Sequence, residues 1–133
     1  TAPPPASQKK ILLVEDTAFF SKLVQGYLES DGYAVQTAPN GKAALELLAS
    51  THFDIIISDI EMPVMNGWEF LKHLREDHAF DDIPAMALTA LDSDEDKNRA
   101  AKAGFDAYEV KIDRERLLVK VAQLLEARDV VTQ

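Results

Sequence analysis

The sequence predicts an α/β fold in which helices cover both faces of a parallel sheet. Short runs of consecutive apolar residues alternate with longer segments in which apolar residues recur at helical spacing. Continuous apolar runs are typical of strands buried on both faces, and strands joined through helices by right-handed crossovers lie parallel. With 133 residues, 47% of them apolar, the chain is long enough for one compact domain.

The first apolar run, residues 10–14, is too continuous for a half-exposed strand, and we predict a buried parallel strand there. The helix that follows has apolar residues at helical spacing, namely Phe20, Leu23, Val24, Tyr27 and Leu28. Asp31-Gly32 ends this helix, because glycine readily adopts the left-handed conformation that closes a helix. A second strand is predicted over residues 33–38.

Asn40-Gly41 begins a second helix, whose apolar face consists of Ala44, Leu45, Leu47 and Leu48. Residues 54–59 contain three consecutive isoleucines and form the clearest buried strand of the chain. The third helix carries on one side Gly67, Phe70, Leu71 and Leu74. These segments therefore continue the alternation of strand and helix.

A fourth strand is predicted over residues 83–89, with Pro84 at the entry position that a strand tolerates. The helical pattern of residues 92–103 contains only alanine as apolar residue, so this helix should be weakly anchored. Residues 107–111 give a fifth strand. Asp113 is expected to cap the last helix, whose apolar residues are Leu117, Leu118, Val121, Leu124 and Leu125.

Chemically different groups lie where the predicted strands end, namely Glu15, Asp16, Asp59, Thr89 and Lys111. In α/β sheets of this kind, ligands bind outside the carboxyl ends of the strands. In the flavodoxin-like strand order 2-1-3-4-5 the first and third strands are neighbours, so the three carboxylates would meet. Clustered carboxylates repel one another unless a cation joins them, and Mg²⁺ suits such a site, with Mn²⁺ as an alternative. Two of these carboxylates can hold the cation and the third can act as nucleophile toward phosphorus, while the Thr89 hydroxyl and the Lys111 ammonium can bind the phosphoryl oxygens. This is the outline of a phosphorylation site.

Residues 59–67, Asp-Ile-Glu-Met-Pro-Val-Met-Asn-Gly, resemble the acceptor-strand and loop motif of response-regulator receiver domains. The resemblance extends from Lys9 to about Arg128 and also includes the acidic pair, the Leu88-Thr89-Ala90 step, the turn at residues 103–107 and the lysine of the fifth strand. It implies a doubly wound (βα)5 fold with a five-stranded parallel sheet in the order 2-1-3-4-5.

The resemblance also implies a role for each site residue. Asp59 would attack a phosphohistidine on a histidine kinase or a histidine phosphotransfer domain and become an acyl phosphate. Asp16 would bind Mg²⁺ directly, Glu15 would hold it mainly through its water shell, and the backbone carbonyl of Glu61 would complete the protein ligands. The metal and Lys111 would neutralise charge on the phosphoryl oxygens, where most catalysis of phosphoryl transfer lies.

Two further residues would report the phosphorylated state. The Thr89 hydroxyl would donate to a phosphoryl oxygen by moving toward Asp59, and Tyr108 would swing inward behind it. The helix at residues 92–103 buries little and should shift at little cost. Together with the fifth strand and the last helix, it forms the face on which we expect a downstream protein target.

The sequence divides into residues 1–8 as a Pro-rich linker or frayed terminus, 9–128 as the receiver domain and 129–133 as a tail. Ile112 departs from the family pattern, because most receivers carry proline after the strand-five lysine, and the loop there is expected to take a different path. Residues 111–118 resemble receivers at the end of chemotaxis-type hybrid histidine kinases. With the Pro-rich start, this favours a module excised from such a kinase.

Plainer and competing interpretations exist for the same residues. Taken singly, Glu15-Asp16 would cap a helix, Asp59 and Thr89 would be turn residues, and Lys111 would be a solvated charge. A degenerate receiver that binds partners without phosphorylation is one alternative. An aspartyl-phosphate phosphatase of the haloalkanoate dehalogenase type is another, but its nucleophile follows the first strand within a D-x-D motif. The ordered set of residues favours the receiver, a phosphoacceptor that assists its own phosphorylation and dephosphorylation rather than a conventional enzyme.

Composition disfavours several other classes of function. A formal net charge of −9 argues against nucleic-acid binding, which needs clustered Lys and Arg. The chain has no cysteine and no apolar run of membrane-spanning length, so we expect a cytoplasmic protein without direct membrane insertion. Glycine-rich phosphate-binding loops are also missing, which disfavours nucleotide binding.

Overall fold

The computed structural model describes residues 8–111 and 113–132, with the side chains of residues 129–132 excepted. The strands are β1 (Lys10–Val14), β2 (Ala34–Ala38), β3 (Ile55–Ser58), β4 (Ala85–Thr89) and β5 (Ala107–Val110). The helices are α1 (Ala18–Ser30), α2 (Gly41–Leu48), α3 (Gly67–Glu76), the short 3-10 helix η2 (His78–Phe80), α4 (Asp94–Ala103) and α5 (Arg114–Thr132). Strands and helices therefore alternate as the sequence predicts.

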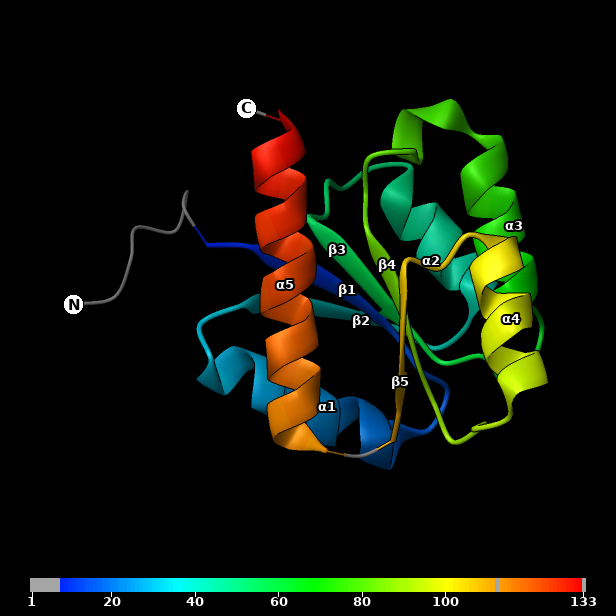
Figure 1. Ribbon diagram of the computed structural model, residues 1–133, viewed down its shortest axis with the longest axis horizontal. Coiled ribbons are helices and arrows are strands. Elements are labelled where there is room, and N and C mark those ends of the chain that lie inside the picture. The colour runs from blue at the N-terminus through cyan, green and yellow to red at the C-terminus, as the bar shows by residue number, and fades with distance from the viewer. Residues whose placement is uncertain (1–7, 112, 133) are drawn as a thin grey trace.

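The five strands form one parallel sheet in the order β2-β1-β3-β4-β5, which confirms the predicted flavodoxin-like topology. The register keeps the carboxyl ends of the strands level: Val14 pairs with Ser58, and Thr89 pairs with Val110. As a result, the residues that follow β1, β3, β4 and β5 all emerge at one edge of the sheet (Figure 1).

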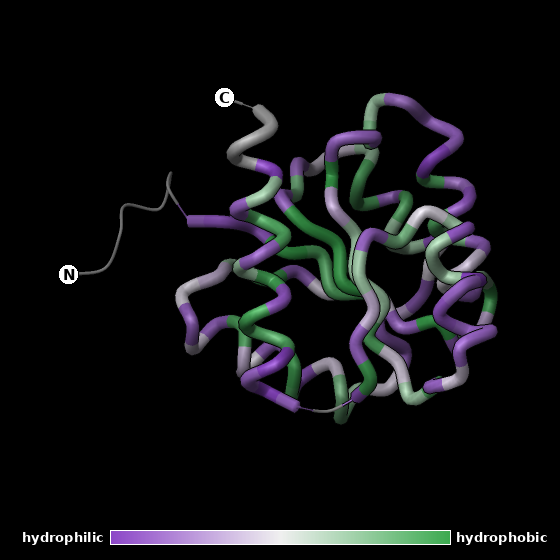
Figure 2. The backbone as a smooth tube through the Cα atoms, viewed as in Figure 1, coloured by the Kyte–Doolittle hydropathy of each residue, from purple (hydrophilic) through white to green (hydrophobic). Residues whose placement is uncertain are grey.

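Helices cover both faces of the sheet, with α1 and α5 on one face and α2, α3 and α4 on the other (Figure 1). Successive strand residues point to opposite faces, so both faces of β1 are apolar: Ile11 and Leu13 contribute to one core, and Leu12 and Val14 to the other. Figure 2 shows the hydrophobic residues concentrated in the central strands. The continuous apolar runs in the sequence are therefore the result of burial on both faces.

Local signals explain where the helices near the site begin and end. Asn66 caps α3 through a capping box with Glu69, in which each side chain accepts from the other residue's backbone N–H. Ser93 caps α4 by accepting from Asp96 N–H at 3.1 Å, and Gly104 ends α4 in the left-handed conformation at φ 117°. Asp113 caps α5 as predicted, since its Oδ1 accepts from Arg116 N–H at 3.0 Å.

The α4 helix is attached to the rest of the domain by few buried side chains. Ala100 is its one buried residue, which agrees with the weak anchoring predicted from its composition. On its exposed side the guanidinium of Arg99 stacks over the indole of Trp68 in α3, 3.7 Å from the ring centroid. Trp68 Nε1 is buried and, within the described part of the chain, finds no hydrogen-bond partner. Trp68 therefore packs against the core, with an arginine of α4 as its neighbour.

Several predicted boundaries differ from the structure. The second strand begins at Ala34, because the Tyr33 N–H still bonds to the Leu28 carbonyl at the end of α1. Asp54 precedes β3, since its carboxylate accepts from the Lys10 N–H at 2.8 Å. The η2 helix was not predicted. Ile112 and residues 1–7 lie outside the described residues.

None of the described helices has the length and apolar character needed to span a membrane.

Candidate functional site

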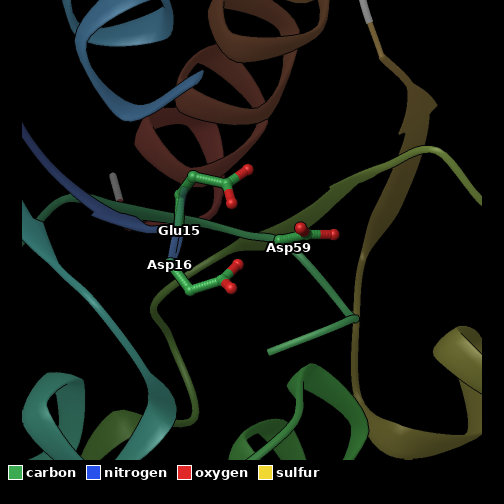
Figure 3. A group of neighbouring side chains, drawn as sticks. All are labelled: Glu15, Asp16 and Asp59. Carbon is green, nitrogen blue, oxygen red and sulfur yellow. The ribbon is translucent and has the colours of Figure 1, made fainter. Parts of the chain in front are cut away.

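Three carboxylates gather at the carboxyl edge of the sheet. Glu15 and Asp16 follow β1, and Asp59 follows the neighbouring strand β3. One carboxylate oxygen from each lies within 4.8 Å of the others, and Figure 3 shows the three side chains side by side. Glu15 and Asp59 are each only 6% exposed, whereas Asp16 is exposed to solvent. The cluster is therefore a pocket with two buried acids and one acid at its mouth.

Backbone hydrogen bonds fix the two buried acids in place. Glu15 Oε2 accepts from Thr17 N–H at 3.1 Å, at the turn that leads into α1. Asp59 Oδ1 accepts from Ile60 N–H at 2.7 Å, while its own N–H donates to the Val14 carbonyl at 2.9 Å. Each carboxylate thus has one oxygen held by the backbone and one left for the pocket.

Lys111 reaches these free oxygens from the end of β5. Its Nζ donates to Asp59 Oδ2 at 3.0 Å and also to Glu15 Oε1. Its side chain is only 10% exposed, and its backbone N–H donates to the Thr89 carbonyl at 2.9 Å, which ties the lysine to β4. The sequence predicted that Lys111 would offset negative charge here, and the structure shows it joining two of the three acids directly.

Burial and pairing shift the pKa values in this pocket. Burial raises the pKa of Glu15 above its usual 4.5, although the hydrogen bonds from Lys111 and Thr17 act in the opposite direction. For Lys111, burial alone would lower the pKa, but the hydrogen bonds to Glu15 and Asp59 outweigh it and the net pKa is raised. The ammonium therefore stays charged and offsets negative charge in the pocket.

The donor set fits a hard divalent cation. Carboxylate oxygens from Glu15, Asp16 and Asp59 lie close enough to share one ion, and Mg²⁺ is commonly bound through one or two carboxylates with retained waters. Exposure of Asp16 leaves the mouth open to water and to a substrate phosphate. Glu61, the predicted source of a backbone ligand, lies two residues after Asp59 in the loop that leads toward α3, and its side chain is exposed.

Gly67 allows this loop to fold tightly against Asp59. A Cβ at position 67 would meet the backbone of Asp59 and lie 2.7 Å from Ile60 Cα. The Gly67 N–H donates to the Ile60 carbonyl at 2.8 Å, so the start of α3 lies directly against the backbone next to Asp59. Glycine is therefore required at this position for steric reasons.

Thr89 and Tyr108 both form a hydrogen bond with the backbone of Leu91, which follows β4. The buried Thr89 Oγ1 accepts from Leu91 N–H at 3.3 Å, and the Tyr108 hydroxyl donates to the Leu91 carbonyl at 2.7 Å. Burial, assisted by nearby carboxylates, raises the pKa of Tyr108 to about 12, so the phenol remains a donor at neutral pH. The two residues are therefore linked through Leu91.

Residues 11–122 match the model of the family described as the response regulator receiver domain. The chain belongs to this family. Among curated relatives, it is 38% identical over 124 residues to a protein named probable transcriptional regulator ycf29 of Pyropia yezoensis, covering 93% of this chain and 56% of that protein. It is 34% identical over 100 residues to the polar-differentiation response regulator DivK of Brucella ovis, covering 75% and 81%. The chain spans about half the length of several curated relatives that it matches.

Solved receiver structures share the fold. The chemotaxis response regulator CheY4 of Vibrio cholerae superposes with a TM-score of 0.84 at 34% identity, over 89% of this chain and 99% of that one. The receiver family therefore accounts for the sheet order and for an acidic pocket at its carboxyl edge.

The structure brings together the predicted residues Glu15, Asp16, Asp59 and Lys111. It joins Thr89 and Tyr108 through the backbone of Leu91. Sequence reasoning missed two residues. The link that the Leu91 backbone makes between Thr89 and Tyr108 could not be predicted, because backbone N–H and carbonyl groups give no signal in the sequence. The helical spacing predicts Phe20 on the apolar face of a helix, but its ring centroid lies 4.6 Å from Lys111 Nζ.

Proposed function

We propose that this receiver domain accepts a phosphoryl group on Asp59 in an Mg²⁺-dependent reaction and passes the signal on through a change of surface. A single observation carries the proposal. The Asp59 carboxylate is buried between an ammonium and two further carboxylates, with one oxygen turned toward the pocket. This arrangement suits a nucleophile that attacks phosphorus and then needs its new charge neutralised.

The donor would be a phosphohistidine on a histidine kinase or a histidine phosphotransfer domain, as is general for receiver domains. A bond forms between an Asp59 carboxylate oxygen and phosphorus while the bond from phosphorus to the imidazole nitrogen breaks. The imidazole leaves with that electron pair and takes up a proton, and Asp59 becomes an acyl phosphate. Bound Mg²⁺ would supply positive charge to the phosphoryl oxygens.

The chain's own residues would orient the reactants. Lys111 already donates to Asp59 Oδ2, so its ammonium is placed to donate to a phosphoryl oxygen attached there. We propose Asp16 as the direct metal ligand, Glu15 as a ligand through bound water and the Glu61 backbone carbonyl as the remaining protein ligand. The exposed position of Asp16 and the burial of Glu15 support this division.

The response to phosphorylation would begin at Thr89. Its hydroxyl would donate to a phosphoryl oxygen by turning toward Asp59, and this movement would pull its oxygen away from Leu91 N–H. Loss of that bond frees the segment around Leu91, which also holds the Tyr108 hydroxyl. We propose that Tyr108 then moves inward, as the sequence suggests, and that the nearby α4 shifts.

The face that would change is formed by α4, β5 and α5. A groove of about 530 Å³ on this face is lined by residues with both signs of charge, among them Asp92, Lys97, Glu109, Lys111 and Lys120. Lys111 lines this groove and also donates to Asp59 in the acidic pocket, so one residue takes part in both. We propose that a downstream protein binds on this face.

We also propose residues 9–128 as the receiver module, preceded by a Pro-rich linker and followed by a tail, although α5 continues to Thr132. A chemotaxis-type hybrid histidine kinase remains our preferred parent protein. This preference rests on the sequence that follows Lys111 and on the presence of Ile112 where most receivers have proline.

Mass spectrometry of the intact protein tests the proposed function. Incubation with Mg²⁺ and acetyl phosphate should add one phosphoryl group, and omission of the metal or the substitution Asp59→Asn should prevent it. Asp31→Asn, which changes an exposed aspartate at the end of α1, is the matched control and should leave phosphorylation intact. An unmodified wild-type protein under these conditions would instead support a degenerate receiver that only binds partners.

A further inference from the structure

Three groups surround the ammonium of Lys111, two of them anionic and one aromatic. Besides its hydrogen bonds to Glu15 and Asp59, Nζ lies 4.6 Å from the centroid of the Phe20 ring. The electron-rich face of an aromatic ring attracts a cation at this distance, and the attraction is stronger where water is excluded. The Lys111 side chain is 10% exposed, so the aromatic contact forms in a largely dry environment.

Phe20 is not explained by packing of the hydrophobic core. It is the third residue of α1, yet it belongs to neither of the two apolar clusters in the described part of the chain, nor to the side chains packed against them. Its ring lies against Lys111 and makes an edge-to-face contact with Phe19, with the ring centroids 5.6 Å apart and an interplanar angle of 80°. Phe19 itself is 70% exposed. Phe20 therefore contacts the lysine of the site and an exposed ring of the same helix.

The chemistry proposed above requires Lys111 to change partners. Before transfer its ammonium donates to Asp59 Oδ2, and afterwards it must follow the phosphoryl oxygens on the same residue. Glu15 competes for the ammonium through its second hydrogen bond. An aromatic ring attracts the cation without adding a competing anion, so it can hold Nζ over the pocket while the anionic partner changes.

We propose that Phe20 is a positioning residue for Lys111 in phosphoryl transfer to Asp59, an inference that rests on the proposed function. Phe20 does not touch the reacting atoms and acts through the lysine. Its contribution should be visible in the maximal rate of phosphorylation and not in the affinity for the metal.

The experiment measures the rate of phosphorylation by acetyl phosphate over a range of donor concentrations at saturating Mg²⁺. Phe20→Leu keeps an apolar side chain but removes the ring, and we expect the maximal rate to fall about tenfold, the upper part of the range for a cation–π contact. Phe20→Tyr keeps the aromatic face and should restore most of the rate. Phe19→Leu, the matched control on the neighbouring ring, should change the rate little. A Phe20→Leu rate equal to that of the wild type would overturn the proposal.

Two further measurements separate positioning from folding. Phenylalanine analogues with increasing numbers of ring fluorines weaken the negative face at nearly constant size, so the rate should fall with each fluorine, and a flat series would overturn the proposal. In a Lys111→Met background, Phe20→Leu should have no additional effect. An equal loss in both backgrounds would show that the ring acts elsewhere.

The outcomes also distinguish this inference from the proposed function. A wild-type chain that stays unmodified would overturn the proposed function, and the role of Phe20 with it. Normal phosphorylation of the wild type together with an unaffected Phe20→Leu variant would overturn the inference alone.

Discussion

Lys111→Met should destabilise the domain most when no divalent metal is present. The lysine is the ammonium that joins Glu15 and Asp59, whose side chains are 4% and 7% exposed. Methionine has a similar length without the charge, so the variant leaves two buried carboxylates without this cation. Removal of one partner from a buried ion pair is strongly destabilising, because the remaining charge has lost its compensation.

The structure bounds the size of this effect. Removing one member of a buried pair typically costs about 3 to 5 kcal/mol. Protonation of Glu15 limits the cost, because burial already raises its pKa above 4.5 and loss of the Lys111 hydrogen bond would raise it further, while Asp59 still loses its ammonium partner. We therefore expect a loss in the free energy of unfolding at the lower end of that range, about 3 kcal/mol.

Urea unfolding in EDTA and in Mg²⁺ measures this loss. With a slope of about 2 kcal/mol per molar urea, the midpoint of the variant should fall by about 1.5 M in EDTA. Mg²⁺ should stabilise the variant more than the wild type, since the bound metal becomes the main counter-charge. Lys97→Met, which removes a 44% exposed lysine 3.4 Å from Asp92, is the control and should cost at most about 1 kcal/mol. Equal stability of Lys111→Met and wild type in EDTA would refute the reasoning.

Three other predictions concern residues around the site and the opposite edge of the sheet. Gly67→Ala places a methyl group against the backbone of Asp59, so urea unfolding should show a loss of about 1 to 3 kcal/mol, and phosphorylation should slow. Burial opposes ionisation of Asp54, but hydrogen bonds from a backbone N–H and from Arg128 outweigh it and lower its pKa below 3.8. The stability that ionised Asp54 contributes is therefore present above pH 3.8 and is lost as the pH falls through the lowered pKa. The free energy of unfolding of Asp54→Asn should depend less on pH in this acid range. An unchanged pH dependence would contradict this assignment. The difference between the absorbance titrations of wild type and Tyr108→Phe should show a phenol that ionises near pH 12. Ionisation near pH 10 would mean that burial and the nearby carboxylates do not raise the pKa of Tyr108.

Most of the fold could be predicted from the sequence because both faces of the sheet are buried. Buried parallel strands appear in the sequence as continuous apolar runs, as in residues 10–14, whereas the helices between them appear as apolar residues at helical spacing. Boundaries were less accurate, because they depend on single side chains. Asp54 has an apolar run directly after it, but its carboxylate bonds the Lys10 N–H, so the strand starts one residue later.

The site was predictable to the extent that it consists of residues at strand ends. Parallel topology brings such residues together whatever the details of packing, so Glu15, Asp16, Asp59 and Lys111 could be grouped without coordinates. Contacts that depend on the placement of a helix could not be predicted from the sequence. The position of Phe20 over the lysine follows from how α1 starts after the acidic pair, and no pattern in the sequence encodes that orientation.

The stacking of Arg99 on Trp68 makes the intrinsic tryptophan fluorescence of this protein sensitive to the position of α4. Trp68 is the chain's sole tryptophan, so its emission arises from one known position between two helices. A guanidinium 3.7 Å from an indole alters the electronic surroundings of the ring, and any displacement of that helix would change them again. Intrinsic fluorescence can therefore follow the domain in real time and without a dye, including in mixtures with donors or targets that contain no tryptophan.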